Sequence, residues 1–377
     1  MLMNMLEKRK ETAQPTSFEQ KCFNLLDRHL KNMTWGHLVL QLPDGSENHY
    51  GNDSPEKRII VKRYRFFSRL VLGGNIGLGE TWTDHDWTSS DLTGVLELFI
   101  HNMAALKKSG LSAAIAKRVV NVVGHAKNKN TKEGSRRNIH AHYDLGNDFY
   151  RLFLDPETMM YSSAVFSRDT AGPSPDESLA DAQRNKIHRL IELADIRREH
   201  HVLEIGCGWG GFAIEAVRKT GCRVTAITIS NEQFSYAKNK VSAAGLEDRI
   251  EVAMIDYRDL KGQFDRIVSI EMLEAVGHAY YGTYFETCDR LLKPDGKVVL
   301  QVITIPDQRY DAYRSNPDWI QKHIFPGGML PSLTELSKAM TRHSSFTVEH
   351  LSNIGVDYAE TLRRWRDAYQ EKIKEFL

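Results

Sequence analysis

Four glycines follow a short apolar stretch in VLEIGCGWGGFAIEA, residues 202–216. They are Gly206, Gly208, Gly210 and Gly211. Glycine lets the backbone approach a bound molecule closely, and a helix that begins after such a turn offers free N–H groups to a ligand. The spacing G-x-G-x-G differs from the G-x-G-x-x-G pattern of dinucleotide sites. Because Trp209 places an indole where a pyrophosphate would lie, the segment predicts a nucleotide-like ligand without phosphates.

A candidate carboxylate lies in the segment SIEMLEAVGH, residues 269–278. Glu274 and His278 are four residues apart and could share one face of a helix, but no third ligand at metal-site spacing follows, so we expect no metal. The segment also lacks the Asn/Asp-Pro-Pro-aromatic pattern typical of methyltransferases that act on exocyclic amines of nucleic acids. With a formal net charge of only +1, we expect no nucleic-acid partner.

The elements around these residues predict an α/β fold. From about residue 180 onward, strand-like and helical segments alternate, which is typical of a parallel sheet covered by helices on both faces. The predicted strands are HVLEIG, RVTAIT, RIEVAMI, FDRIVSI and KVVLQVI. Helices are predicted from Gly211, over 231–244 with Ser230 as the N-cap, over 271–276 and over 281–292. The glycine segment then follows the first strand, and Glu274 follows the fourth.

The N-terminal part of the chain predicts a smaller α+β domain over residues 17–122. An apolar periodicity indicates a helix near residues 18–26, and WGHLVLQL and IIVKRY indicate strands, the first ending in a turn at residues 43–45. The four glycines of FFSRLVLGGNIGLGE predict a compact turn instead of a long helix. An amphipathic helix is predicted from about residue 91 to about residue 108.

Length and composition support two globular domains. A chain of 377 residues exceeds what one hydrophobic core usually organises, and 41% hydrophobic with 26% charged residues is ordinary for a globular protein. The polar, basic segment GHAKNKNTKEGSRRN predicts a linker over residues 123–139. Before it we expect a flexible segment 1–16 and the α+β domain 17–122, and after it a catalytic domain 140–377. No apolar run reaches membrane-spanning length, and the charged N-terminus does not resemble a signal peptide, so we expect a cytoplasmic protein with reduced cysteines.

The strand and glycine loop resemble those of class I S-adenosylmethionine-dependent methyltransferases. More narrowly, the chain resembles the cyclopropane-fatty-acid synthase family. The segments that carry this resemblance are HYDLGNDFYRLFLDPETMMYSSAVF, LEIGCGWGGFAIEA, TAITISNEQ, DYRDL, FDRIVSIEMLEAVGH, VVLQVITIPDQRY, HIFPGGMLPS and NIGVDYAETLRRWR. The resemblance implies a Rossmann-like methyltransferase domain and S-adenosylmethionine as the cofactor. It implies a cofactor site in which Tyr161 and Ser162 contact the methionine end, Thr228 and Gln233 bind the ribose, and Asp256 and Tyr257 border the adenine. The middle of the cofactor is expected to be lined by the glycine loop, with Gly206, Cys207, Gly208, Trp209 and Gly210.

The implied reaction is methyl transfer to the cis double bond of an unsaturated acyl chain in a membrane phospholipid. The resulting carbocation loses a proton to a bound bicarbonate, and a cyclopropane ring closes. The resemblance implies that bicarbonate is held by Glu274, Tyr358, Gln301 and the backbone N–H groups of Ser163 and Ile270. Ser163 and Gln301 replace the cysteine and histidine common in bacterial members. A methyl- or methylene-branched product therefore stays open, as does a catalytically inactive lipid-binding relative.

Two basic clusters are candidates for contact with anionic headgroups at the inner face of the membrane. The first contains Arg58, Lys62, Arg63, Arg65 and Arg69, and the second contains Lys127, Lys129, Lys132, Arg136 and Arg137. Solvated surface charge is the alternative interpretation of both. The α+β domain is expected to contact lipid or a second copy of the chain. Relatives usually continue beyond the position where RRWRDAYQEKIKEFL ends, so we expect the family's final segment to be missing.

Overall fold

The computed structural model describes residues 14–108, 134, 146–169 and 172–376. Contacts divide the chain into two compact units, one formed chiefly by residues up to 123 and the other chiefly by residues from 124 onward. The predicted linker and its basic cluster lie almost entirely outside the described residues. No helix in the described part of the chain is long and apolar enough to cross a membrane.

The first unit is an α+β fold, as predicted. Its helices are α1 (Ser17–Leu30), α2 (Arg65–Thr83), α3 (Leu92–His101) and α4 (Met103–Lys108), and its strands are β1 (His37–Gln41), β2 (Glu47–Tyr50), β3 (Glu56–Val61) and β4 (Trp87–Thr88). The strands form one sheet in the order β2-β1-β3-β4, in which only the β1–β3 pair is parallel. Thr16 caps α1 through a reciprocal pair of hydrogen bonds with Glu19.

The glycine-rich segment of this unit is helical, so the prediction of a compact turn there is wrong. Helix α2 runs through it with one kink at Gly74, where φ is +55°. A Cβ atom at Gly77 would lie 2.2 Å from the carbonyl oxygen of Arg69, which explains why glycine is needed where the two halves approach. Packing of Phe66, Phe67 and Ile76 into the core stabilises both halves against the low helix propensity of glycine.

The helix predicted over 91–108 is interrupted once. Asp91 caps α3, and α4 begins after Asn102. The Asn102 side chain is fully buried and donates 2.8 Å hydrogen bonds to the carbonyl oxygens of Trp35 and Leu98, while it accepts from the backbone of Thr34. This asparagine therefore ties the helix pair to the loop before β1.

The first basic cluster is largely engaged in ion pairs within this unit. Asp86 is fully buried and receives Arg63, Arg65 and Arg69 at 3.3, 2.7 and 3.0 Å. Arg58 pairs with Glu47. These arginines stabilise their own unit, which favours the structural interpretation of this cluster over headgroup binding.

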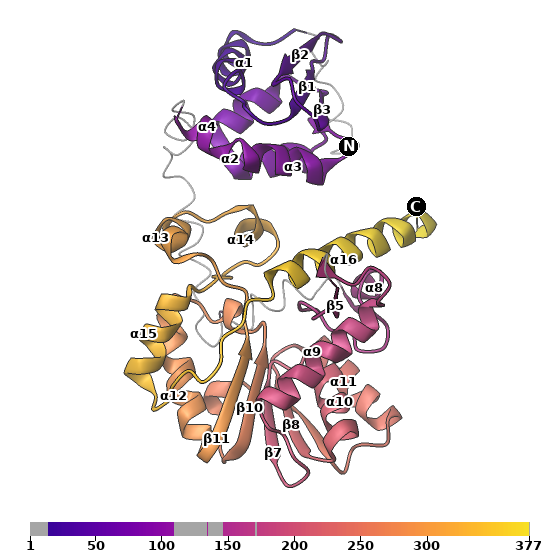
Figure 1. Ribbon diagram of the computed structural model, residues 1–377, viewed down its shortest axis with the longest axis vertical. Coiled ribbons are helices and arrows are strands. Elements are labelled where there is room, and N and C mark those ends of the chain that lie inside the picture. The colour runs from indigo at the N-terminus through magenta and orange to yellow at the C-terminus, as the bar shows by residue number, and fades with distance from the viewer. Residues whose placement is uncertain (1–13, 109–133, 135–145, 170–171, 377) are drawn as a thin grey trace, which may run out of the picture. The chain divides into compact units, whose positions relative to one another are not determined.

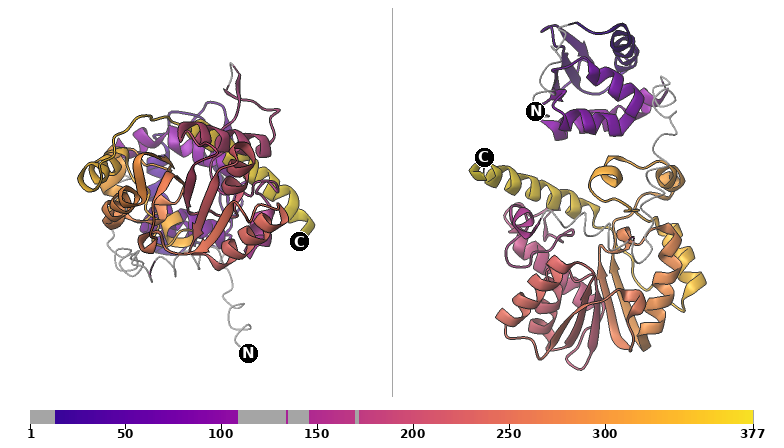
Figure 2. Two further views of the ribbon diagram at one scale, coloured as in Figure 1. Left: turned by 90° about the horizontal axis from the view of Figure 1, so that it is seen from below. Right: turned by 180° about the vertical axis from the view of Figure 1, so that it is seen from behind.

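The second unit contains the predicted parallel sheet. Strands β7 (His201–Ile205), β8 (Arg223–Thr228), β9 (Ile250–Met254), β10 (Phe264–Ile270) and β11 (Leu292–Gln301) pair in the order β11-β10-β7-β8-β9, and every pair is parallel. Helices α9 (Leu179–Leu193), α10 (Gly211–Thr220) and α11 (Asn231–Ala243) cover one face (Figure 1). Helices α12 (Tyr281–Leu291) and α15 (Leu333–His343) cover the other, as Figure 2 also shows from behind. The predicted parallel sheet with helices on both faces is thereby confirmed.

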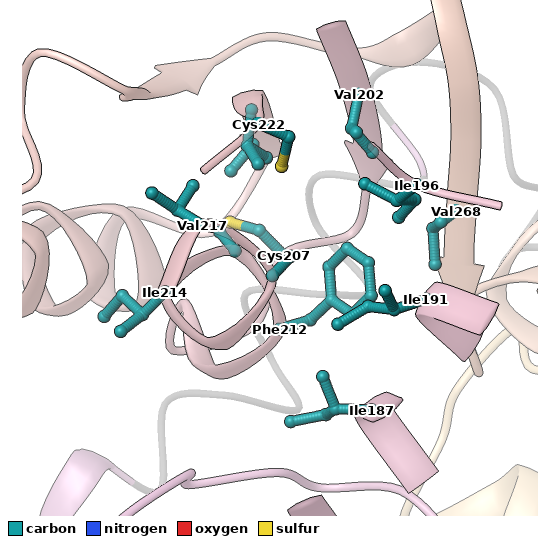
Figure 3. Close-up of a cluster of buried hydrophobic side chains, with 14 of the residues drawn as sticks. Ile187, Ile191, Ile196, Val202, Cys207, Phe212, Ile214, Val217, Cys222 and Val268 are labelled. Carbon is teal, nitrogen blue, oxygen red and sulfur yellow. The ribbon is translucent and has the colours of Figure 1, made fainter. Parts of the chain in front are cut away.

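Successive strand residues enter opposite layers of the core. On β7, Val202 packs in the cluster under α9 and α10, whereas Leu203 packs in the cluster under α12. Figure 3 shows the first of these clusters, in which Phe212 of α10 lies among Ile187 and Ile191 of α9. The predicted cap at Ser230 is confirmed, because it accepts a hydrogen bond from the backbone of Gln233. The last strand, β11, begins at Leu292, five residues before the predicted start of KVVLQVI.

One helix prediction in this unit is wrong. Residues 271–276 form only a single 3-10 turn over Leu273–Ala275. Glu271 and Gly277 both adopt positive φ, at +50° and +83°, and these conformations end any helix on either side.

The remaining elements lie around the carboxyl ends of the strands. They are α8 (Gly146–Arg151), the paired strands β5 (Arg168–Asp169) and β6 (Gly172–Pro173), the 3-10 turns Tyr257–Asp259 and His278–Tyr280, α13 (Asp307–Ser315), α14 (Trp319–His323) and α16 (Gly355–Phe376). Helix α16 is fixed by two buried side chains. Thr361 Oγ1 accepts from the backbone of Ala164 at 3.1 Å, and Asp357 accepts from the backbone of Phe166 at 3.0 Å and pairs with Arg168 at 2.7 Å.

Candidate active site

The glycine segment forms an open backbone cradle at the end of β7. Gly206, Gly208 and Gly210 have φ of +84°, +51° and +83°, which only glycine adopts at low cost. The N–H groups of Gly206 and Cys207 both donate to the carbonyl oxygen of Ile227, so the loop is anchored to β8. A Cβ atom added at Gly208 would meet no protein atom within 4 Å. This space, beside the start of α10, fits the expected cofactor.

The predicted Cys207 contact can come only from the backbone. Its side chain is buried in the hydrophobic core (Figure 3), and burial raises the pKa of its thiol well above the usual range.

The predicted ribose residues lie together at the end of β8. Thr228 Oγ1 donates to Gln233 Oε1 over 3.0 Å, and both side chains are buried. This bond fixes the orientation of the Gln233 amide, whose nitrogen has no protein partner among the described residues. Gln233 can therefore donate to a ligand oxygen.

The predicted adenine residues follow β9 and depend on an arginine that we did not predict. Both carboxylate oxygens of Asp256 accept from Arg258, at distances of 2.6 to 3.0 Å. The guanidinium also lies 5.5 Å from the centre of the Tyr257 ring, which meets Tyr284 edge to face. Arg258 thus holds both predicted side chains in place.

Tyr161 and Ser162 lie beside a buried polar network that sequence reasoning missed. Lys186 Nζ donates to Ser162 Oγ over 2.6 Å, and Gln183 donates to the carbonyl oxygen of Ser162 over 2.9 Å. Burial lowers the pKa of Lys186 to about 7, although the charges of Glu271, Asp155 and Glu204 oppose this shift. Burial likewise raises the pKa of Glu204 well above its usual range.

The ring of Tyr161 belongs to one cluster with aromatic rings from other segments of the chain. Its ring lies 5.2 Å from that of Tyr150 and 5.3 Å from that of Trp365. Trp209 packs 4.9 Å from Tyr150, and its indole N–H donates to Asn147 over 2.7 Å. Trp209 is only 3% exposed, so much of its role is packing. The faces of such rings can stabilise a nearby cation without reacting with it.

A second glutamate, Glu271, lies among the residues predicted to hold bicarbonate. Its Oε1 accepts from Ser163 N at 2.8 Å and from Gln301 Nε2 at 2.9 Å, and Gln301 also donates to the carbonyl oxygen of Ser163 at 3.0 Å. Ile270, the last residue of β10, is in register with Gln301 of β11. Burial raises the pKa of Glu271, while the hydrogen bonds from Gln301 and Ser163 and the charge of Lys186 lower it.

Glu274 and Tyr358 complete the cluster. Glu274 accepts from the backbone of Ile303 through Oε1, whereas its buried Oε2 has no hydrogen-bond partner among the described residues. Burial, and then the charge of Glu271, raise the pKa of Glu274 to about 8. Burial raises the pKa of Tyr358, and the charges of Glu271 and Glu274 add to the effect. The structure therefore brings Ser163, Ile270, Glu274, Gln301 and Tyr358 together, with Glu271 among them.

Bicarbonate does not fit this arrangement. The Ser163 N–H and the Gln301 amide, two of its expected donors, already bind Glu271. A bicarbonate would add another anion beside two buried carboxyl groups, which is costly in a low-dielectric interior. The sequence E-M-L-E already contained the signal for a second carboxylate at Glu271. The predicted helix over this segment would have placed it differently from the observed backbone turn.

His278 does not join Glu274 in a metal site. Its ring nitrogens lie 2.7 Å from the Tyr310 hydroxyl and 2.9 Å from Arg314. Within the described residues, no group of three potential ligands could hold a metal ion.

Comparison with known proteins identifies the family. Residues 130–377 match the model of the mycolic acid cyclopropane synthetase family. The chain is 37% identical to Tuberculostearic acid methyltransferase UfaA1 of Mycobacterium tuberculosis over 91% of this chain and 80% of that protein. It is 36% identical to the cyclopropane-fatty-acyl-phospholipid synthase of Escherichia coli K12 over 84% of this chain and 78% of that protein.

A solved structure supports the same family and the cofactor. The crystal structure of mycolic acid cyclopropane synthase CmaA1 complexed with SAH and CTAB matches with 33% identity and a TM-score of 0.57, over 64% of this chain and 85% of that chain. The glycine cradle, the Thr228–Gln233 pair and the carboxylate cluster occupy one edge of the matching fold. The chain therefore belongs to the mycolic acid cyclopropane synthetase family and is an S-adenosylmethionine-dependent methyltransferase.

Proposed function

We propose that this chain methylates the cis double bond of an unsaturated acyl chain in a membrane phospholipid, with a cyclopropane as the expected product. The observation that carries the proposal is the buried Glu271–Glu274 pair beside the aromatic rings of Tyr161, Tyr358 and Trp365. Such an arrangement of buried carboxyl groups and aromatic rings suits a reaction that builds positive charge on a hydrocarbon. The similarity to the Escherichia coli cyclopropane-fatty-acyl-phospholipid synthase supports the substrate class.

The residues of the site have distinct tasks in this reaction. S-adenosylmethionine supplies an electrophilic methyl group when bound. The electron pair of the alkene forms the new carbon–carbon bond, which leaves a cation on the neighbouring chain carbon. Aromatic faces and buried carboxylates lower the energy of that cation, and exclusion of water prevents its capture. Loss of a proton from the added methyl group then closes the ring.

A branched product is the second candidate. It is favoured by the similarity to a protein named for tuberculostearic acid methylation, which covers more of this chain than the similarity to the Escherichia coli synthase. In that case the cation loses a proton from a chain carbon, which leaves a methyl-branched alkene. Alternatively, after a hydride shift along the chain, it loses a proton from the added methyl group, which leaves a methylene branch. Bound phospholipid and peripheral membrane association are part of the proposal in both cases.

Deuterium labelling separates these outcomes. The protein is incubated with unsaturated phospholipid vesicles and S-adenosylmethionine that carries a CD3 group, and the acyl chains are analysed by mass spectrometry and NMR. A ring or a methylene branch retains two deuterons, whereas a methyl branch retains three. NMR distinguishes a ring, which lacks olefinic carbons, from a methylene branch.

Controls identify the source of the label. Glu274→Gln should cut label incorporation far more than cofactor affinity, because Glu274 is placed in the carboxylate cluster and not in the glycine cradle. If wild-type protein binds S-adenosylmethionine but transfers no label to any unsaturated lipid, the proposed substrate class is wrong and the inactive, lipid-binding alternative gains support.

A further inference from the structure

Glu271 is held in a conformation that its surroundings impose. Its φ of +50° is unusual for a residue with a side chain and is energetically unfavourable. The backbone N–H of Glu271 donates to the carbonyl oxygen of Gln301 over 2.7 Å, and Oε1 accepts from both Ser163 and Gln301. Unfavourable backbone geometry of this kind persists when a specific side-chain position matters.

The Glu271 carboxylate lies where a bound anion would have to lie. A free anion here would use the Ser163 N–H and the Gln301 side chain, and the Glu271 carboxylate occupies both. Lys186 is a buried cation whose charge acts on Glu271 and on Glu204. One ammonium group is thus shared between carboxyl groups that the chain already supplies, and it leaves little to compensate an additional anion.

We propose that Glu271 is the resident anion of this active site, in place of an exchangeable bicarbonate, and that methyl transfer by this chain does not require bicarbonate. The inference rests on the proposed alkene methylation and specifies the group that receives the proton. When the new methyl group loses a proton to the Glu271 carboxylate, the C–H electron pair forms the third bond of the ring. Glu271 becomes a neutral acid and returns its proton to solvent before the next turnover.

The two glutamates are suited to different protonation states. Burial raises the pKa of Glu271, but hydrogen bonds from Gln301 and Ser163 and the charge of Lys186 oppose this shift and favour its ionised form. Glu274 Oε2 has no partner in the described part of the chain, and burial, then the charge of Glu271, raise the pKa of Glu274. When their surroundings shift the pKa values of two neighbouring carboxyl groups apart in this way, one group is the proton acceptor and the other stays protonated.

The test compares wild type with two substitutions at position 271 in buffer freed of carbon dioxide. Glu271→Gly opens the anion position, and glycine suits the positive φ, so the fold should be retained. We expect wild-type methylation to be unchanged by added bicarbonate. Glu271→Gly should lose at least ~100-fold in rate, the usual size of general-base catalysis, and should recover with millimolar bicarbonate. Glu271→Gln fills the position without accepting a proton, so it should stay inactive with bicarbonate.

A binding measurement keeps this inference separate from the proposed function. Broadening of the 13C resonance of labelled bicarbonate, with titration of SAH as the check on folding, requires no lipid turnover. Bicarbonate should bind Glu271→Gly and not wild type. Three results would each overturn the inference. They are binding of bicarbonate to wild type, slower wild-type turnover in the absence of bicarbonate, and full activity of Glu271→Gly in the absence of bicarbonate. If bicarbonate binds only Glu271→Gly but neither wild type nor any variant methylates lipid, the proposed function is wrong. The assignment of Glu271 as the resident anion is then still supported.

Discussion

Lys186 Nζ lies 2.6 Å from Ser162 Oγ, in a part of the core where Lys186 is fully buried and Ser162 is 2% exposed. Because the ammonium group can only donate, the Ser162 hydroxyl accepts this bond and keeps its own proton for another partner. Ser162 is one of the residues expected to contact the methionine end of the cofactor. Lys186 is therefore a positioning residue for the cofactor site as well as a counter-charge for Glu204 and Glu271.

Lys186→Met should weaken SAH binding by roughly tenfold, which corresponds to about 1.4 kcal/mol. It should also destabilise the fold by roughly 3 kcal/mol, because buried carboxyl groups lose their cation. Calorimetric titration and urea denaturation measure the two effects. Lys240→Met is the matched control, since Lys240 is also a lysine whose pKa burial lowers, but its ammonium group donates to the carbonyl oxygen of Glu157. Equal loss of affinity in both variants would indicate a general effect of instability.

Gly208→Val should reduce SAH affinity by at least ~100-fold, or about 2.7 kcal/mol. A side chain at Gly208 meets no protein atom, so it would enter the space left for the cofactor. Gly245→Val is a close control, because Gly245 has a φ of +66° and equally open surroundings after the end of α11. Both variants incur similar backbone strain, and only Gly208→Val should lose affinity in calorimetry. Unchanged affinity would place the cofactor elsewhere.

Thr361→Val should destabilise the second unit by about 1 to 3 kcal/mol, because it leaves the buried N–H of Ala164 without a partner. It should also lower turnover more than cofactor affinity, since α16 carries Tyr358. Thr341→Val serves as the control, because the Thr341 hydroxyl bonds only within its own exposed helix surface. Urea denaturation and steady-state kinetics report the two effects. Wild-type stability in Thr361→Val would show that α16 is held by other contacts.

The contribution of Glu274 to the free energy of unfolding should fall as the pH rises from about 4.5 to about 8. The pKa of Glu274 is about 8 in the folded chain, against an ordinary value near 4.5, so between these pH values the folded state binds a proton that the unfolded state has lost. Since one pKa unit corresponds to about 1.4 kcal/mol, Glu274→Gln should reduce this decline by at least ~2 kcal/mol. Denaturation at several pH values tests the slope. Glu349→Gln, at an exposed glutamate, should leave it unchanged.

The sequence allowed the sheet and most of the site to be predicted because their signals are local. The runs HVLEI, RVTAIT and FDRIVSI form strands where predicted, and Ser230 caps its helix through a residue three positions away. Glu271 depends instead on Ser163, 108 positions away in the chain, and on a backbone turn that no propensity reveals. Lys186 was missed because lysine is almost never fully buried. The kinked helix α2 shows tertiary packing overriding the low helix propensity of its glycines.

Docking to a membrane must rely on local charge, since the net charge is only +1. Three arginines of the first basic cluster bind Asp86, so the second cluster is the better candidate, although it lies outside the described residues. Charge reversal at Lys129, Lys132, Arg136 and Arg137 should therefore lower binding to anionic vesicles and activity on them, while SAH affinity stays the same. Each basic residue near the surface contributes about 1 kcal/mol, so four reversals should reduce vesicle binding by well over 100-fold.

Salt and a charge-matched variant make this prediction specific. Surface attraction is screened beyond about 8 Å at physiological ionic strength, so raising salt should bring wild-type vesicle binding toward the level of the variant. The control reverses four exposed basic residues of the second unit, Arg198, Lys219, Lys238 and Lys261, and has the same net charge. If both variants lose vesicle co-sedimentation equally, general charge governs binding. If neither substitution nor salt changes it, electrostatic docking is wrong, and exposed apolar side chains such as Ile100 and Met103 become the candidates for membrane contact.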